Sequence, residues 1–214
     1  MWTNQSGVNM PDAVDRLTPL GVVVLALLGE GDMHPYEMIR LMRIRRDDRL
    51  VTITNGTVYH TVSRLERAGL LAEVGVDRDG NRPERTTYAV TDAGSAAVTE
   101  WVRRELVRVD HPSEFRIALA EAHNLDRVEV IALLHDHRAA RAAAQSEISI
   151  GLRGAIAKGV PIQYLLELER EESLQATDLQ WLDRLIQRLE GEEFPWGAHE
   201  PSQRYLEQRK AARL

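Results

Sequence analysis

Cysteine is absent from this chain of 214 residues. This absence excludes disulfides, zinc sites built on thiolates and cysteine nucleophiles, and it is compatible with a reducing cytoplasm. Long apolar runs are also absent, because the longest one, Val22 to Leu28, is far too short to span a bilayer. The first fifteen residues lack the basic start and apolar centre of a signal peptide. We therefore expect a cytoplasmic protein with no membrane-inserted segment.

The chain lacks an excess of positive charge, since its formal net charge is −6. That charge is unevenly distributed. Residues 16–90 hold 11 Lys and Arg against 10 Asp and Glu, whereas residues 91–214 hold 16 against 21. Nucleic-acid binding depends on a local basic face rather than on the whole-chain charge, so the first half is still compatible with it. The acidic second half indicates a different task.

Recognisable catalytic, metal and cofactor sites are lacking as well. His135 and His137 stand two positions apart, which on a helix turns their imidazoles about 200° away from each other. Gly151 and Gly154 do not form a phosphate loop, because the lysine and the longer glycine spacing are missing. A small hydrolase built on the acidic half would need convergent titratable groups, and none can be nominated. The sequence predicts no metal, no cofactor and no enzyme.

The most informative stretch runs from Thr52 to Tyr88 and begins with a short helix. Thr54 can cap its first free backbone N–H groups. Val58, Val62 and Leu65 follow at a spacing that forms one apolar helix face. Gly69 supplies the left-handed residue that ends such a helix.

Two strands are predicted directly after this helix. Residues 71–76 form a strand-like run, Asp79-Gly80-Asn81 is a turn signal, and residues 85–90 alternate between two faces. A short helix followed at once by a hairpin with an arginine-rich tip describes a winged helix.

The side chains on the outward face of this helix are mostly short, polar and uncharged. A helix surface selected only for solubility would carry pairs of Glu and Lys. Reading base edges in a major groove instead needs compact donors and acceptors, with Arg and Tyr for phosphates. A face that simply meets water is the alternative interpretation, and the basic hairpin downstream favours DNA. The face comprises Asn55, Gly56, Thr57, Tyr59, His60, Ser63 and Arg64.

Two more helices are expected before this stretch. The first starts with Thr18 as cap and Pro19 at the first helical position, and Gly29-Glu30-Gly31 ends it. The second opens at His34-Pro35, and we expect it to direct Tyr36, Ile39 and Met42 inward. The arginines near its end suit a helix C-terminus and are equally compatible with contacts to the DNA backbone; they are Arg40, Arg43, Arg45, Arg46 and Arg49.

After the hairpin, Thr91-Asp92 caps a helix that runs to about Val107, with Trp101 on its buried side. Trp101 could form a stacking platform for a drug, but a tryptophan on a helix face is more often part of the core. His111-Pro112 breaks the chain, and we place a domain boundary there. A short helix around residues 115–122 follows it.

Two long helices end the ordered part of the chain. Asp126 caps one that runs to about Ile156, Gly159 to Pro161 makes a turn, and the last helix spans about residues 162–189. Its apolar residues form a coiled-coil-like seam. Two such helices cannot hide all their apolar surface on each other, so we expect a second copy as partner. The predicted dimerisation residues are Leu165, Leu168, Leu179, Leu182, Ile186 and Leu189.

Three stretches of this sequence resemble the PadR family of bacterial transcriptional regulators. They are LTPLGVVVLALLGEGDMHPYEM, GTVYHTVSRLERAGLL and RPERTTYAVTDAG, and YLLELEREESLQATDLQWLDRLI is similar to the carboxy-terminal helical domain of the family. The resemblance covers about residues 17–189. It implies a dimeric repressor of nearby genes that is released by a small-molecule effector or another signal, which in founding members is a phenolic acid. Nothing in these residues singles out a phenolic ligand.

We therefore predict a mainly α protein with a small β-wing. Residues 1–15 are expected to be a mobile tail, 16–107 a winged helix-turn-helix domain, 113–190 a helical dimerisation domain with antiparallel helices, and 191–214 a polar tail. The winged helix would bind double-stranded DNA at an inverted-repeat operator. A dimeric helical adaptor that binds no DNA is the alternative. Trp101 and Trp181 are both expected to be structural.

The expected DNA surface divides by role. Residues in the first turns of the recognition helix are candidates for base edges, and the flank and hairpin tip are candidates for the DNA backbone. Asn55, Thr57 and His60 form the first group; Tyr59, Arg64, Arg82 and Arg85 form the second; Ser63 completes the surface.

Overall fold

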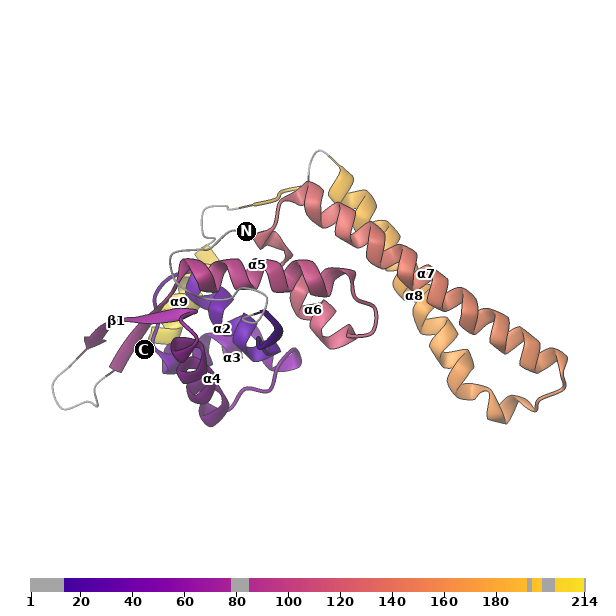
Figure 1. The fold of residues 1–214 in the computed structure, drawn as a ribbon, viewed down its shortest axis with the longest axis horizontal. Coiled ribbons are helices and arrows are strands. Elements are labelled where there is room, and N and C mark those ends of the chain that lie inside the picture. The colour runs from indigo at the N-terminus through magenta and orange to yellow at the C-terminus, as the bar shows by residue number, and fades with distance from the viewer. Residues whose placement is uncertain (1–13, 78–84, 192–193, 198–202, 214) are drawn as a thin grey trace. The chain divides into compact units, whose positions relative to one another are not determined.

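The computed structural model of the protein describes residues 14–77, 85–191, 194–197 and 203–213. Its contacts divide the chain into two compact units. Among the described residues, the first takes in those up to residue 104, residues 116–121 and the carboxy-terminal helix, and the second takes in those of 105–115 and 122–197. Helices dominate both, and the sheet of the described residues has two strands (Figure 1). The fold is mainly α with a small β-wing, as predicted.

The helices of the first unit begin and end where local sequence signals place them. Thr18 accepts a hydrogen bond from the backbone N–H of Gly21, at 3.2 Å, and His34 Nδ1 accepts one from Tyr36, at 3.1 Å. Gly69 has a φ of 70°, which ends the recognition helix. The elements are α2 (Pro19–Gly29), α3 (Pro35–Arg45), the short 3₁₀ helix η1 (Asp47–Arg49) and α4 (Asn55–Arg67).

The wing consists of strands β1 (Leu71–Asp77) and β2 (Arg85–Val90), paired antiparallel with Leu71 opposite Val90. Its register shifts between Glu73 and Gly75. Met33 extends the sheet by one bridge to Tyr88, with backbone hydrogen bonds of 3.0 and 3.1 Å. The predicted turn at 79–81 and Arg82 lie outside the described residues.

The core of the first unit is formed by the apolar faces of α2, α3, α4 and α5 (Asp92–Val107). Trp101 on α5 is 1% exposed, so the prediction that it belongs to the core is confirmed. Tyr36 is 44% exposed, and the prediction that it points inward is therefore wrong. Val14 and Asp15 were expected in a mobile tail but contact the rest of the protein. Val14 is buried, and Asp15 forms an ion pair with Arg104 at 2.9 Å.

A helix occupies part of the segment that was expected to be a loose polar tail. It is α9 (Gln203–Arg213), and it packs on α3. Most of its residues are charged or Gln, and Ala212 is its one buried apolar residue among those described. The apolar periodicity that predicts a helix is therefore missing, because charged contacts hold this one in place.

The second unit is built around an antiparallel pair of long helices (Figure 1). Gly159, with a φ of 76°, lies in the turn between them. Arg138 forms an ion pair with Asp183 at 2.6 Å and Arg141 one with Asp178 at 2.7 Å across the hairpin, and His135 Nε2 lies 3.2 Å from Glu190 Oε1. The long helices are α7 (Arg127–Ala157) and α8 (Leu166–Glu190), with α6 (Pro112–Ala120), η2 (Ala122–Asn124) and η3 (Ile162–Tyr164) before or between them.

The leucine seam of α8 faces α7 of the same chain. Leu165, Leu182, Ile186 and Leu189 are buried within the single chain, and Leu168 and Leu179 are half-buried. For the four buried residues the expectation that they meet a second copy is wrong, because the hairpin itself covers them. For Leu168 and Leu179 it stays a prediction. Sequence periodicity shows that a seam exists and does not show which helix covers it.

A different apolar stripe of α8 is open to solvent. Leu174 is 48% exposed and Trp181 is 36% exposed, so Trp181 lies outside the core that holds Trp101. The structural role expected for Trp181 stays a prediction. Leu185, half-buried, continues the stripe at helical spacing. These three residues form what we call the outer stripe of α8.

His137 gives the second unit a predicted dependence on pH. Its ring is 1% exposed and stacks on Phe115 with 4.1 Å between centroids. Burial lowers the pKa of His137, and the charge of Arg141 lowers it further, while Asp178 acts in the opposite direction. The folded state therefore resists protonation that the unfolded chain accepts.

We expect the second unit to lose stability as the pH falls below about 6.5, the ordinary pKa of histidine, because the unfolded state then binds the extra proton. His137→Phe keeps the stacked ring and removes the titrating group, so its urea midpoint should fall less between pH 7.5 and pH 5. Val128→Phe, which adds a ring at an exposed position of the same helix and removes no titrating group, is the control. Equal losses in wild type and His137→Phe would contradict the assignment.

None of the helices among the described residues is both long and apolar enough to cross a lipid bilayer. Across the same residues, no three His, Asp or Glu side chains converge in a way that could hold a metal ion.

Candidate nucleic-acid interface

The recognition helix α4 buries one face and leaves a polar face exposed. Val58, Thr61, Val62 and Leu65 are buried, so the three predicted apolar positions are confirmed and Thr61 joins them. Asn55, Tyr59, His60 and Ser63 lie on the exposed face. Among the described residues these four side chains form no hydrogen bond with one another or with the backbone, so their polar groups are available to a ligand.

Thr57 is committed to the start of the helix. Its hydroxyl donates to the carbonyl of Thr54 at 3.0 Å and accepts from the Thr54 N–H at 3.0 Å, while Thr54 Oγ1 accepts from the Thr57 N–H at 3.1 Å. This reciprocal arrangement is a capping box. Thr57 therefore has a structural role at the helix start, and its role in reading a base edge stays a prediction. The Thr-x-x-Thr spacing was the sequence signal for the capping box.

Arg64 also forms a hydrogen bond within the protein. Its Nη2 donates to Thr18 Oγ1 at 2.7 Å, the same oxygen that caps α2, and the side chain is half-buried. This contact joins the recognition helix to the first helix of the unit. Arg64 thus helps to fix α4 against α2, and its contact with a phosphate stays a prediction.

The arginines near the end of α3 differ in whether they have an ion-pair partner within the protein. Arg45 donates to both carboxylate oxygens of Glu30, at 2.6 and 2.8 Å, and Arg46 lies 3.5 Å from Asp48. Arg43 and Arg49 are exposed and have no ion pair among the described residues. A local role within the protein therefore fits Arg45 and Arg46, and contact with the DNA backbone remains open to Arg43 and Arg49.

A second polar cluster lies at the start of α3. The sequence had indicated Arg40 and Arg85 as candidates for DNA contacts, but not His34 and Tyr36 beside them. Tyr36 stacks on His34, with 6.0 Å between ring centroids, and Arg40 Cζ lies 5.7 Å from the Tyr36 ring centre. Burial lowers the pKa of His34, and the positive charge of Arg85 at the start of β2 lowers it further. The i, i+4 spacing of Tyr36 and Arg40 was the available signal. We call His34, Tyr36, Arg40 and Arg85 the α3 cluster.

The structure thus brings two kinds of group to the surface of the first unit. The face of α4 offers an amide, a hydroxyl, a phenol and an imidazole, which are compact donors and acceptors suited to base edges. The α3 cluster offers two guanidinium groups and a phenol, which suit phosphates. Arg82, expected at the wing tip, lies outside the described residues.

The comparisons with known proteins agree with this description. Residues 24–100 match the model of the transcriptional regulator PadR-like family. No curated protein sequence matches the chain.

Three solved structures illustrate the likeness. Bacillus subtilis PadR in complex with operator DNA is 18% identical, with 81% of this chain and 100% of that chain covered and a TM-score of 0.38. The same protein in complex with p-coumaric acid is 18% identical, with coverage of 81% and 100% and a TM-score of 0.35. The PadR-like transcriptional regulator BC1756 from Bacillus cereus is 17% identical, with coverage of 81% and 99% and a TM-score of 0.36. Over residues 24–100, the chain is therefore similar to the PadR-like family of transcriptional regulators.

Proposed function

We propose that this protein is a dimeric, sequence-specific DNA-binding repressor that reads an inverted-repeat operator with α4. The observation that carries the proposal is the exposed face of α4, where Asn55, Tyr59, His60 and Ser63 have polar groups without partners among the described residues. Polar groups left free on the second helix of a helix-turn-helix are available to base edges. The DNA-free adaptor has no use for such a face.

The α3 cluster supports a division of labour on this surface. Arg85 and Arg40 are long cations that can reach phosphates without needing a fixed geometry, and Tyr36 can donate its hydroxyl to one. Asn55 lies at the first position of α4, the end that enters the groove in this class of proteins. We assign base reading to the α4 face and backbone contact to the α3 cluster.

Selection of DNA fragments from a random pool by the purified full-length protein tests this function and identifies the operator. Enrichment of an inverted repeat supports it. Recovery of DNA without any enriched sequence would overturn sequence-specific reading, and recovery of no DNA would favour the adaptor. Placing the recovered operator before a reporter gene then distinguishes a repressor from an activator.

The two roles predict opposite effects of two substitutions. Arg85→Ala should weaken binding to operator and random DNA alike and reduce the salt slope by about one unit for each chain bound. Asn55→Ala should keep the salt slope, lose about 1–3 kcal/mol of operator binding and relax one operator position.

Arg153→Ala is the matched control, since Arg153 is an exposed arginine on α7 of the second unit. Fluorescence anisotropy at several salt concentrations measures all three variants. If neither Arg85→Ala nor Asn55→Ala changes affinity for operator or random DNA, this surface does not read DNA.

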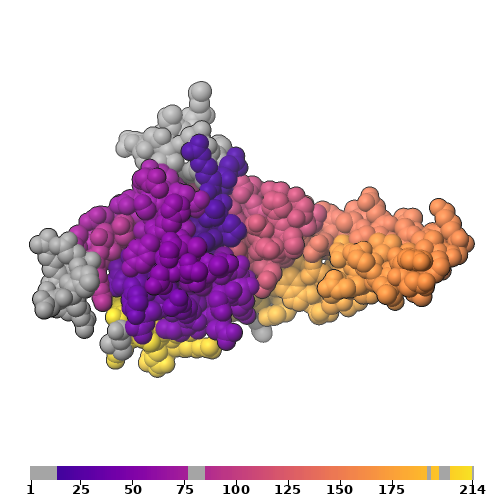
Figure 2. Space-filling model, turned by 90° about the horizontal axis from the view of Figure 1, so that it is seen from below, coloured from indigo at the N-terminus to yellow at the C-terminus, as the bar shows by residue number. Residues whose placement is uncertain are grey.

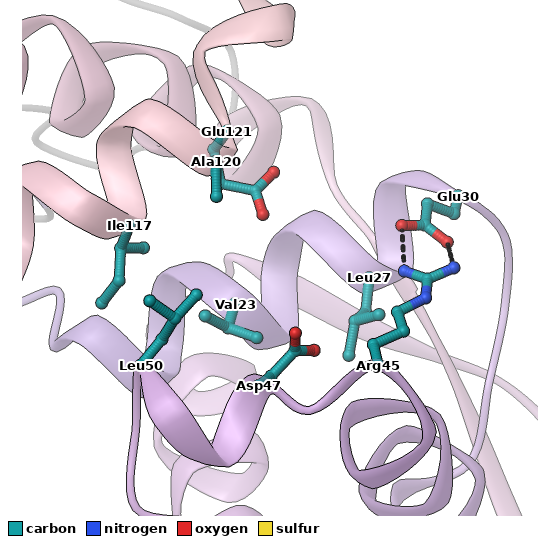
Figure 3. Close-up of a pocket in the computed structure, with 9 residues that line it drawn as sticks. All are labelled: Val23, Leu27, Glu30, Arg45, Asp47, Leu50, Ile117, Ala120 and Glu121. Carbon is teal, nitrogen blue, oxygen red and sulfur yellow. Dashed lines mark hydrogen bonds and ion pairs between the residues drawn. The ribbon is translucent and has the colours of Figure 1, made fainter. Parts of the chain in front are cut away.

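Release by a small molecule is part of the proposal, and the first unit contains a hollow of about 80 Å³ beside the helix-turn-helix (Figure 3). Val23, Leu27 and Leu50 contribute apolar walls, and Asp47 and Glu121 contribute carboxylates. Burial raises the pKa of Asp47 against the opposing charges of Arg45 and Arg49. Such a lining suits a neutral or cationic group better than the carboxylate of a phenolic acid. Adding p-coumaric acid to the operator-binding assay tests whether a phenolic acid releases the DNA.

A further inference from the structure

The carboxy-terminal helix α9 runs antiparallel along α3, the first helix of the helix-turn-helix. At one end, Arg45 Cζ lies 5.3 Å from the centre of the Tyr205 ring. At the other end, Arg213 Nε donates to Glu37 Oε1 at 3.1 Å. Glu37 and Arg45 are as far apart in the sequence as Tyr205 and Arg213, so the two helices stay in register along their shared length.

The central contact of this pair is a buried carboxylate. Glu37 is 5% exposed, and its Oε1 lies 3.1 Å from Arg213 Nε and 3.8 Å from Arg209 Nε. A buried carboxylate is costly unless opposite charges and hydrogen bonds compensate it. Among the described residues, both cations that compensate Glu37 come from α9. Removing them would leave a charge uncompensated inside the helix-turn-helix.

The same contacts extend to the end of α2. Arg209 Nη1 donates to the backbone carbonyl of Glu30 at 3.1 Å, while the carboxylate of Glu30 accepts two hydrogen bonds from Arg45 (Figure 3). Helix α9 therefore closes the carboxy-terminal end of α2 as well as lining α3. In the space-filling view, yellow atoms of the carboxy-terminal segment border the purple surface of the first unit (Figure 2).

We propose that α9 is a working part of the DNA-reading unit and that Glu37, Arg209 and Arg213 are positioning residues for the recognition helix. Helix α3 leads into α4 through η1, and α3 also carries Tyr36 and Arg40. A tilt of α3 would therefore displace the α4 face and the α3 cluster together. These side chains act through α3 and touch no DNA. The proposal rests on the proposed function, because its main readout is operator binding.

The test uses full-length Glu37→Gln and Arg213→Gln proteins and the double variant, with Arg204→Gln as control for a change of charge at an exposed position of α9. Affinities are measured at a temperature at which circular dichroism shows the wild-type helix content. Each single variant should lose about tenfold in operator affinity and less than about twofold for random DNA, since a tilted reader loses specificity first. The double variant should lose little more than either single one, because the two residues share one contact.

Arg204→Gln should bind as the wild type does. Operator affinity within twofold of wild type in the Glu37→Gln protein overturns the proposal. Hydrogen exchange of the α3 amides tests, in the absence of DNA, whether the contacts of Glu37 with α9 hold α3 in place. We call these contacts the clamp. Faster exchange in the Glu37→Gln protein than in wild type supports the clamp, and unchanged exchange overturns it even if the proposed DNA binding has itself failed.

Discussion

Replacing Gly94 by alanine should unfold the junction between the recognition helix and α5. A Cβ atom at this position would lie 2.0 Å from the backbone carbonyl oxygen of Leu70 and 2.9 Å from Cγ2 of Val90. The first of these is a backbone atom and cannot rotate away. We expect a loss of about 3 kcal/mol or more in the free energy of unfolding, at the upper end of what overpacking costs.

The contact matters because several hydrogen bonds converge on the same place. Thr91 Oγ1 donates to the Gly69 carbonyl at 2.8 Å and accepts from the Gly94 N–H at 3.1 Å, while the Thr91 N–H donates to Leu70 at 3.1 Å. Separating α5 from Leu70 would break these bonds. The end of α4 and the start of the wing would then lose their common support, and operator binding should be lost with them.

Thermal unfolding followed by circular dichroism measures the effect. Gly151→Ala is the matched control, because a Cβ there meets nothing within 4 Å and the residue lies inside helix α7. Alanine at that position should be neutral or should stabilise the protein by up to about 1 kcal/mol. A melting temperature of Gly94→Ala equal to that of wild type would show that the close approach does not exist in solution.

Charging the outer stripe of α8 should convert a dimer into monomers. Leu174 and Trp181 are 48% and 36% exposed and lie on the same side of the helix. We propose that a second copy covers them, since an inverted-repeat operator requires two readers related by twofold symmetry. Leu174→Glu combined with Trp181→Glu places carboxylates in the proposed contact, where burying them would be costly. Light scattering should show a monomer.

The loss of dimerisation should also weaken binding to the operator. Linking two half-site readers raises the affinity for a full operator, so the monomeric variant should bind it about a hundredfold more weakly or worse. Its affinity for a single half-site should stay within about twofold. Gln180→Glu and Gln187→Glu add the same charge at exposed positions of α8 outside the stripe and should leave the dimer intact. A double variant that is still dimeric would place the interface elsewhere.

Local chemistry was enough to predict most elements of this fold. The caps at Thr18, His34 and Thr54 and the left-handed Gly69 act on backbone groups within a few residues, so their consequences can be read along the chain. The wing strands and α5 were predicted for the same reason. The resemblance to PadR regulators rests on these stretches, and the match of residues 24–100 to the PadR-like family model agrees with it.

The candidate site was predictable only in part. Asn55, Tyr59, His60 and Ser63 were found because helical periodicity separates the exposed face of α4 from its buried face. Thr57 and Arg64 lie on the polar side by the same pattern, yet their polar groups bond within the protein. Helical periodicity predicts the direction of a side chain, but it does not predict which hydrogen-bond partner its polar group finds.

The sequence by itself determined the helix ends, the wing strands and the polar face of the recognition helix, because each depends on neighbours in the chain. The tertiary structure decided which cations are free, which helix covers the leucine seam, why Gly94 has no side chain, and that α9 exists. The reason is distance along the chain. Arg64 meets Thr18 across 46 positions and Arg213 meets Glu37 across 176, and no local pattern specifies such partners.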